Sequence, residues 1–340
     1  MSRLPGLDLT RLADWFTAQG PGRPARPLSA RLIAGGRSNL TYEIGDGERV
    51  WVLRRPPLGH VLATAHDVAR EHWVLAALAG TAVPVPATGA LCTDESVIGA
   101  PFYLMAKIDG TPFRSAADLE PLGPERVRRI SLGLVDTLAA LHEVDPVEVG
   151  LADFGRADGF LHRQVRRWSA QLAASRTRDL PRADRLRSRL TTDVPAPAVP
   201  GIVHGDYRLD NVLVDSADRP AAVVDWEMAT LGDPLTDLAL LIAYQKLAGL
   251  PGGALVTDVA SAPGHLTEEE VRERYGSRSG RDLTRFGFYL GLACYKLAAI
   301  VEGVHHRHLR GQTVGTGFEG IGALTEPLLD IGLAALEEDA

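Results

Sequence analysis

Asp206 follows a histidine and a glycine at the end of a short apolar run, and Asn211 lies five residues further along the chain. Glycine permits a sharp backbone turn, so we expect the Asp206 carboxylate to project from a loop. The chain continues through apolar residues 212–214, a polar turn at 215–220 and a second apolar run that ends at Asp225. This pattern predicts a β-hairpin whose two ends bring Asn211 and Asp225 close together.

An amide oxygen and a carboxylate are hard oxygen ligands of the kind that magnesium prefers. Asp206 can accept a hydrogen bond from a substrate hydroxyl and orient it, and phosphoryl transfer needs these same parts. His204-Gly205-Asp206 alone is equally compatible with a plain turn, but the spacing, the hairpin and its acidic end together favour a site. We therefore predict Asp206 as the catalytic residue and Asn211 and Asp225 as magnesium ligands.

The elements that must position these residues fall into two groups. Residues 28–110 contain β-like runs, an Asp-Gly hairpin turn at 46–47 and one clear helix, whereas the rest of the chain is mostly helical. The strands are expected at 28–33, 40–44, 49–54, 88–92 and 102–108. The helices are expected at 8–19, 65–79, 124–143, 158–175, 181–191, 234–249, 267–275, 282–304 and 322–337. The sequence thus predicts an α+β protein with a small antiparallel sheet lobe and a larger helical lobe.

The composition excludes several classes of function. A net charge of -7 over 340 residues argues against a nucleic-acid binder, which needs a basic excess. The only cysteines, Cys92 and Cys294, lie in separate apolar stretches and predict buried thiols in a reducing, cytoplasmic protein. The most apolar stretch, 286–301, carries Lys296 at its centre and predicts a buried helix and no membrane span. The oligomeric state is not indicated.

The stretch from His204 to Asn211, His-Gly-Asp-Tyr-Arg-Leu-Asp-Asn, resembles the catalytic loop of the aminoglycoside phosphotransferase and choline kinase group within the protein-kinase-like fold. Residues 224–227 and 232–238 resemble that group's metal-binding segment and the segment after it. Residues 35–42, 52–57 and 154–156 are similar to the branch of kinase domains fused to acyl-CoA dehydrogenases. The resemblance implies a bilobal kinase-like fold, with a nucleotide-binding lobe at 1–108 and a catalytic and substrate-binding lobe at 109–340.

In that fold, the loop at 35–39 would lie over the phosphates of ATP, with Gly36, Ser38 and Asn39 facing the anion. These residues alone favour a surface hairpin turn. Protein kinases hold the phosphates with a lysine on the third strand, but no lysine precedes Lys107 here. The resemblance therefore assigns this role to Arg54, with Arg55 as the second candidate on the opposite face of the strand.

Glu71, on the first helix of the small lobe, is expected to orient Arg54 as in the kinase lysine–glutamate pair. A solvated helix glutamate is the alternative. Residues 105–108 would form the hinge that binds adenine, with Met105 and Lys107 as candidate nucleotide contacts. A strand that merely joins the lobes is the alternative there.

Some further residues have an expected role, and two features leave alternatives open. Asp237 is expected to brace the catalytic loop, and Glu227 is equally compatible with supporting the metal ligands and with binding the metal itself. His204 and His142 are expected to be structural. An arginine cluster at 163, 166 and 167 is either a solvated helix face or a site for an anionic group on the acceptor.

The sequence thus predicts an ATP- and Mg²⁺-dependent kinase that phosphorylates a hydroxyl of a small molecule. A nucleotide-binding pseudokinase acting as a scaffold is the alternative, although the base and both metal ligands are present. A metal-dependent hydrolase is disfavoured because further histidine–carboxylate clusters are missing. The acceptor is open among aminoglycosides, sugars, amino alcohols and hydroxyacyl-CoA thioesters, and the preference for ATP over GTP is also open.

Overall fold

The structure is a computed structural model that describes residues 4–33, 39–58, 67–313 and 317–338. The chain divides into two compact units. Unit 1 comprises Met1–Gly110 together with Ala221–Ala229, and unit 2 comprises Thr111–Pro220 and Thr230–Ala340. The segment that contains Asp225 therefore belongs to unit 1, although it is distant in sequence from the rest of that unit.

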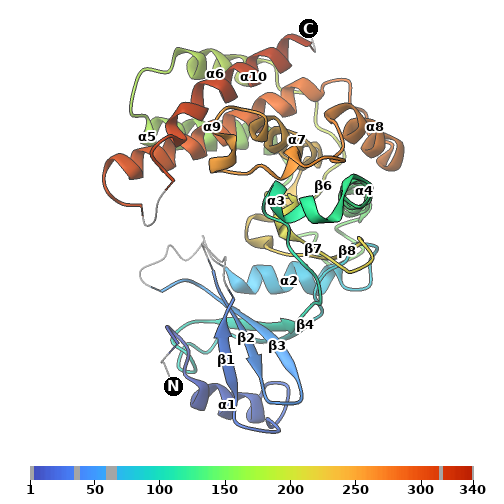
Figure 1. Cartoon of the computed structure of the whole chain (residues 1–340), viewed down its shortest axis with the longest axis vertical. Helices are drawn as coiled ribbons and strands as arrows, with labels where there is room; N and C mark the ends of the chain where they lie inside the picture. Colours follow the sequence, from blue (N-terminus) through green and yellow to red (C-terminus); the bar gives the residue numbers. More distant parts are fainter. Residues whose placement is uncertain (1–3, 34–38, 59–66, 314–316, 339–340) are drawn as a thin grey trace. The chain divides into compact units, whose positions relative to one another are not determined.

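Unit 1 is built on a five-stranded antiparallel sheet with the strand order β1-β2-β3-β5-β4 (Figure 1). Asp46 closes the turn between β2 and β3, where its Oδ1 accepts hydrogen bonds from the backbone N–H groups of Glu48 and Arg49. The expected Asp-Gly turn is therefore present. The strands are β1 (Ser29–Leu32), β2 (Leu40–Gly45), β3 (Val50–Arg55), β4 (Thr88–Cys92) and β5 (Phe102–Ala106).

One helix covers each face of this sheet. Helix α1 (Leu9–Ala18) buries Trp15 and Phe16 in a cluster that includes Leu53 and Phe102. Successive residues of a strand point to opposite faces, so Arg54 and Tyr103 lie on the other face. There they contact Glu71 of α2 (Val68–Leu78). The strand alternation thus fixes which side chains of β3 and β5 reach α2.

Unit 2 is organised around a long buried helix, α9 (Phe286–Leu309), which packs against α5, α6, α7 and α10 (Figure 1). It is apolar enough to cross a membrane by length and composition, but 83% of its most apolar window is buried within the protein. The predicted buried helix is therefore confirmed. The other helices are α3 (Ala116–Leu119), α4 (Pro124–Glu143), α5 (Phe160–Ser175), α6 (Pro181–Thr192), α7 (Leu235–Ala248), α8 (Glu268–Ser279) and α10 (Thr325–Glu338).

Short elements carry the catalytic loop and the hairpin. Strand β6 (Gly201–Val203) pairs antiparallel with β9 (Thr230–Gly232). Strand β7 (Val212–Val214) is followed by a turn in which the N–H of Asp215 donates to the C=O of Arg219. Strand β8 (Pro220–Val223) then leads into unit 1. The 3₁₀ turns are η1 (Glu120–Leu122), η2 (Leu209–Asn211), η3 (Trp226–Met228), η4 (Gly253–Leu255), η5 (Val259–Ser261) and η6 (Ile321–Leu324).

The predicted α+β class is confirmed, with an antiparallel sheet in unit 1 and mostly helices in unit 2. The helix expected at 282–304 begins later, at Phe286, because Asp282 instead accepts hydrogen bonds from the N–H and hydroxyl of Thr284. Strand β9 and helix α3 were not predicted, since segments of three or four residues carry no periodic signal. Both cysteines are free and buried, as expected.

Candidate active site

The catalytic loop of unit 2 begins where β6 ends. Gly205 has a φ of +85°, a left-handed conformation that glycine adopts without strain. Asp237 of α7 accepts hydrogen bonds from the N–H of His204 at 2.6 Å and from the N–H of Gly205 at 2.8 Å. The predicted bracing contacts from Asp237 are therefore present.

Two histidines support this loop from buried positions. The Nδ1 of His204 accepts a hydrogen bond from the N–H of Asp206 at 3.2 Å, and His142 lies 3.4 Å from Asp237 and 2.7 Å from the hydroxyl of Tyr275. Burial pushes the pKa of Asp237 upward, but His142 and the loop N–H groups outweigh burial and hold that pKa below its ordinary value. Asp237 therefore stays ionised, and the structural roles expected for both histidines agree with these contacts.

The carboxylate of Asp206 is held by two side chains. Its Oδ1 accepts from the hydroxyl of Tyr244 at 3.1 Å, and its Oδ2 accepts from the Nδ2 of Asn211 at 3.2 Å. The same Nδ2 donates to the backbone C=O of Asp206 at 2.9 Å. The Asn211 amide oxygen, the atom that a cation binds, takes no part in these hydrogen bonds. The structure thus brings Asp206 and Asn211 together.

Tyr244 was not singled out by the sequence. It lies seven residues after Asp237 on α7, which places both on one helix face two turns apart. That spacing from a loop-bracing aspartate is the signal that could have identified it. Its hydroxyl is buried, which raises the pKa of Tyr244 well above the ordinary value, so it donates to Asp206 as a neutral phenol.

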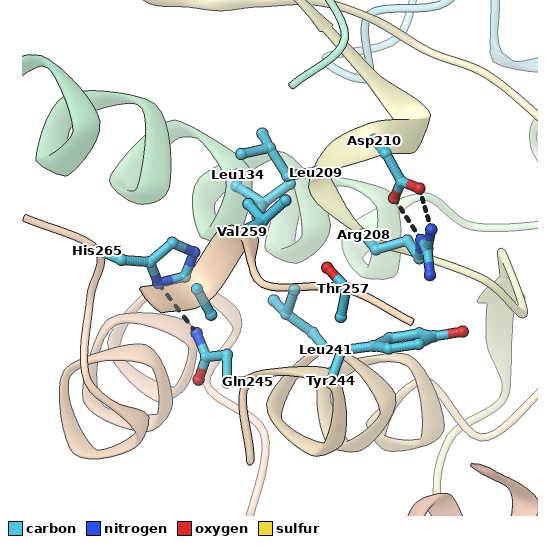
Figure 2. A pocket seen from close by; sticks show the side chains of 11 residues that line it. Leu134, Arg208, Leu209, Asp210, Leu241, Tyr244, Gln245, Thr257, Val259 and His265 are labelled. Atoms are coloured by element: carbon cyan, nitrogen blue, oxygen red, sulfur yellow. Dashed lines mark hydrogen bonds and ion pairs between the residues drawn. The ribbon is translucent and has the colours of Figure 1, made fainter. Parts of the chain in front are cut away.

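A small cavity of about 30 Å³ lies beside this loop, large enough for about one water molecule (Figure 2). Arg208 in its wall pairs with Asp210, and its guanidinium lies 4.7 Å from the centre of the Tyr244 ring. Asp210 is the only acidic residue among those that line the cavity, and its charge is neutralised by Arg208. The remaining lining residues are Leu134, Leu209, Leu241, Gln245, Thr257, Val259, Ala260 and His265.

Unit 1 contains a second cluster of charged side chains, around Arg54. The Nε of Arg54 lies 2.7 Å from Oε2 of Glu71, and its Nη2 donates to Oδ1 of Asp225. Oε2 of Glu227 lies 4.0 Å from the same Nη2. Burial alone lowers the pKa of Arg54, but the carboxylates of Glu71 and Asp225 outweigh burial and raise it. The predicted Arg54–Glu71 pair is therefore present.

Glu71 is the buried anchor of this cluster. Its carboxylate accepts from the hydroxyl of Tyr103 and from the Nδ2 of Asn39, each at 3.0 Å. Burial raises the pKa of Glu71, against the opposing effect of Arg54. Three donors occupy the Glu71 carboxylate. Glu71 therefore orients Arg54 and is itself a poor candidate for a metal ligand.

The strand alternation separates Arg54 from Arg55. The guanidinium of Arg55 is buried under the opposite face of the sheet, where it donates to the backbone carbonyls of Gly6 and Ile98. Backbone carbonyls thus engage Nη1 of Arg55 on that face. Of the two arginines, Arg54 is therefore the one that contacts the carboxylates of Glu71 and Asp225.

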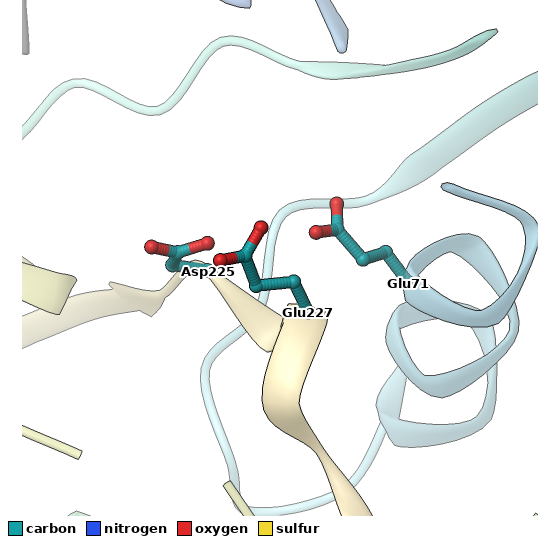
Figure 3. A group of neighbouring side chains, drawn as sticks. All are labelled: Glu71, Asp225 and Glu227. Carbon is teal, nitrogen blue, oxygen red and sulfur yellow. The ribbon is translucent and has the colours of Figure 1, made fainter. Parts of the chain in front are cut away.

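Glu71, Asp225 and Glu227 each offer one carboxylate oxygen, and these three oxygens lie within 4.8 Å of one another; Figure 3 shows the three side chains. Because Glu71 is engaged by its three partners, Asp225 and Glu227 are the carboxylates whose chemistry fits a magnesium ion. Asp225 adopts a left-handed φ of 68°, which aspartate and asparagine tolerate better than most residues other than glycine. Asn211 belongs to unit 2, so a magnesium site shared by Asn211 and Asp225 stays a prediction.

The other candidate nucleotide contacts are placed as follows. Met105, at the end of β5, pairs in register with Val52 and Thr88. The Nζ of Lys107 forms an ion pair with Glu43 at 2.7 Å, so its side chain is engaged within unit 1. Gly36 and Ser38 lie outside the described residues. Asn39 is buried on Glu71, and its Oδ1 has no hydrogen-bond partner among the described residues.

The fold is that of the protein-kinase-like phosphotransferases. Residues 29–282 match the phosphotransferase enzyme family, and the chain belongs to that family. The family and its structural neighbours are small-molecule phosphotransferases. The predicted resemblance is therefore confirmed.

One curated relative and one solved structure resemble this chain over most of its length. The chain is 36% identical over 310 residues to acyl-CoA dehydrogenase family member 10 of Mus musculus, covering 90% of this chain but 29% of that protein. The chain thus spans less than a third of this relative's length. The crystal structure of a Ralstonia eutropha protein assigned as an aminoglycoside phosphotransferase matches with a TM-score of 0.85 and 31% identity, over 97% of this chain and 98% of that one.

A more distant structure shares the fold alone. A thermostable mutant of aminoglycoside phosphotransferase APH(4)-Ia, in a ternary complex with ADP and hygromycin B, matches with a TM-score of 0.60 at 15% identity. It covers 95% of this chain and 98% of its own.

Proposed function

We propose that this protein transfers the γ-phosphoryl group of ATP, in the presence of magnesium, to a hydroxyl of a small molecule. The observation that carries the proposal is the Asp206 carboxylate, held on a braced loop by Tyr244 and Asn211, in a chain of the phosphotransferase enzyme family. A carboxylate fixed in this way can orient an acceptor hydroxyl for in-line attack.

In the proposed reaction, the acceptor oxygen forms a bond to the γ-phosphorus while the bond from that phosphorus to the β,γ-bridging oxygen breaks. Asp206 accepts the hydroxyl proton, and ADP leaves with the bonding electron pair. No phosphorylated protein intermediate is formed. The braces from Asp237 and Tyr244 keep the carboxylate in place, because phosphoryl transfer depends mainly on positioning and charge stabilisation.

On the nucleotide side, Arg54 would contact the phosphates while Glu71 holds its guanidinium in place. Asp225 and Asn211 would bind magnesium, with Glu227 as a further carboxylate, and the bound ion would neutralise phosphate charge. The ADP in the complex of APH(4)-Ia supports a nucleotide in this fold. Arginine can replace the usual lysine because it keeps the charge and adds a bidentate fork.

The arginines on α5 and just before it favour an acceptor with an anionic part. Arg163 lies close enough to Arg156 and Arg166 for their charges to lower its pKa, in addition to the larger effect of burial. Within the part of the chain that the structure describes, none of these three arginines, nor Arg167, forms an ion pair with a carboxylate. A group of cations without carboxylate ion pairs, with the charge of Asp158 nearby, disfavours a polycationic aminoglycoside and suits a phosphate or carboxylate.

The relatives of this chain suggest which anionic acceptor it uses. Its relatives join a domain of this kind to an acyl-CoA dehydrogenase, so we propose a hydroxyacyl-CoA thioester as the acceptor, its phosphates bound by the arginines of α5. The proposal places the hydroxyl before Asp206 and the anionic end toward Arg166.

A turnover screen tests the proposed function. Purified protein with Mg²⁺ and ATP is incubated with hydroxyacyl-CoAs, aminoglycosides, sugars and choline-like alcohols, and ADP release and phosphorylated product are both measured. We expect acceptor-dependent ADP release with hydroxyacyl-CoAs. Nucleotide binding without transfer to any of these acceptors would instead favour the scaffold alternative.

The acceptor assignment predicts the effect of removing two charges. In the double variant Arg166→Gln and Arg167→Gln, we expect KM for the anionic acceptor to rise about tenfold or more, since hydrogen bonds to charged groups contribute about 1.5–3 kcal/mol each. KM for ATP should stay unchanged in steady-state assays. The matched control is Arg187→Gln on α6, an exposed arginine beside Asp184. Equal effects in the control and in the double variant would argue against an anion site on α5.

A further inference from the structure

Lys296 is an unusual residue in this protein. It is one of three lysines among 36 basic residues. The other two form ion pairs with carboxylates, Lys107 with Glu43 and Lys246 with Glu268. For Lys296, no carboxylate lies within ion-pair distance in the described part of the chain. Its Nζ donates instead to the backbone C=O of Gly205, at 2.6 Å.

The surroundings of this ammonium make its position costly. Burial lowers the pKa of Lys296, the charges of Asp206 and Asp237 oppose burial, and the charge of Arg167 acts with it. The Trp168 ring lies 5.3 Å from Nζ and offers a cation–π contact. A partly buried cation without a directly paired carboxylate is unfavourable for folding, so a functional role explains its presence better than stability does.

Asp237 and Lys296 together hold the two peptide units on either side of Gly205, and we call this pair of contacts the clamp. The N–H of Gly205 donates to Asp237 at 2.8 Å, and its C=O accepts from Lys296. The left-handed φ of Gly205 directs these groups to α7 and α9. The C=O of Gly205 belongs to the peptide bond that enters Asp206, so Lys296 fixes the orientation of the peptide that carries the catalytic carboxylate.

We infer that Lys296 is a positioning residue for Asp206: it holds the Gly205–Asp206 peptide in the orientation that transfer requires. This inference rests on the proposed function for its catalytic consequence, but not for its structural one. Lysine suits the task because its ammonium is a compact point charge on a flexible stem, whereas the planar arginine fork needs more room.

The test compares Lys296→Met, which keeps the stem and removes the charge, with Lys296→Arg and with the control Lys246→Met. We expect kcat of Lys296→Met to fall about 100-fold, because a displacement of about 1 Å in a reacting group has an effect of this size. KM and Kd for Mg–ATP should stay within about twofold of wild type. Lys296→Arg should recover part of kcat, and Lys246→Met should behave as wild type. Rates are normalised to the folded fraction measured by near-ultraviolet circular dichroism.

Hydrogen–deuterium exchange supplies a readout that does not need turnover. Lys296→Met should exchange faster than wild type in peptides covering 202–210. Peptides from α9 should exchange at the wild-type rate. If wild type transfers nothing in the screen, the proposed function fails. The exchange measurement still tests whether Lys296 holds the Gly205–Asp206 peptide. Unchanged exchange at 202–210, or a loss of kcat no larger than the loss of folded protein, overturns the inference.

Discussion

Replacement of Asp206 by asparagine is expected to abolish phosphoryl transfer while leaving Mg–ATP binding nearly intact. The amide has the same shape and still accepts the hydrogen bond from Tyr244, but it cannot take the proton of the acceptor hydroxyl. Positioned acid–base groups contribute about 10²–10⁴-fold, so kcat should fall by at least that range. Single-turnover assays with labelled ATP measure the transfer, and calorimetric titration measures nucleotide binding.

The control for this substitution is Asp215→Asn, an aspartate in the hairpin turn whose carboxylate accepts from Arg219. It removes the same charge without touching the catalytic loop, and it should retain wild-type turnover. Substantial transfer by Asp206→Asn would show that another group accepts the proton, and the proposed mechanism would then be wrong.

Most of the fold could be predicted because its elements are long and regular. The helix at 124–143 was predicted with the bounds that the structure gives to α4, since its apolar residues recur at helical spacing. The alternation of β3 likewise separated Arg54 from Arg55. These features depend on local sequence, which is where pattern arguments are reliable.

The site was predictable where one short segment carries several of its parts. Asp206 and Asn211 lie in one motif, and the structure joins them by hydrogen bonds. Tyr244 and Lys296 were not recognised, because they reach the loop from helices 38 and 91 residues further along the chain. Both helices are apolar around most of their circumference, so hydrophobic periodicity does not distinguish a residue that faces the loop, and for Tyr244 the seven-residue spacing from Asp237 is the available signal.

Replacement of Asp225 by asparagine is expected to remove the magnesium dependence of nucleotide binding and to lower kcat by roughly 10²–10³-fold, the range for losing one charge-stabilising group. The fold should tolerate this change, because asparagine also adopts the left-handed backbone that Asp225 has. Titrations with ATP in the presence of Mg²⁺ or of EDTA measure the first effect, and steady-state assays over a range of Mg²⁺ concentrations measure the second.

The ion pair of Arg54 sharpens this last prediction. Arg54 donates to Oδ1 of Asp225, so a magnesium ion that uses this oxygen would have to displace a guanidinium that keeps Glu71 as its partner. With Asp225 neutral, Arg54 loses one anionic partner, keeps Glu71 and the more distant Glu227, and becomes more available to phosphates. Asp225→Asn should therefore bind metal-free ATP at least as tightly as wild type, although it turns over poorly. Weaker binding of ATP in EDTA would contradict this account, and loss of magnesium dependence in Glu227→Gln alone would assign the metal to Glu227.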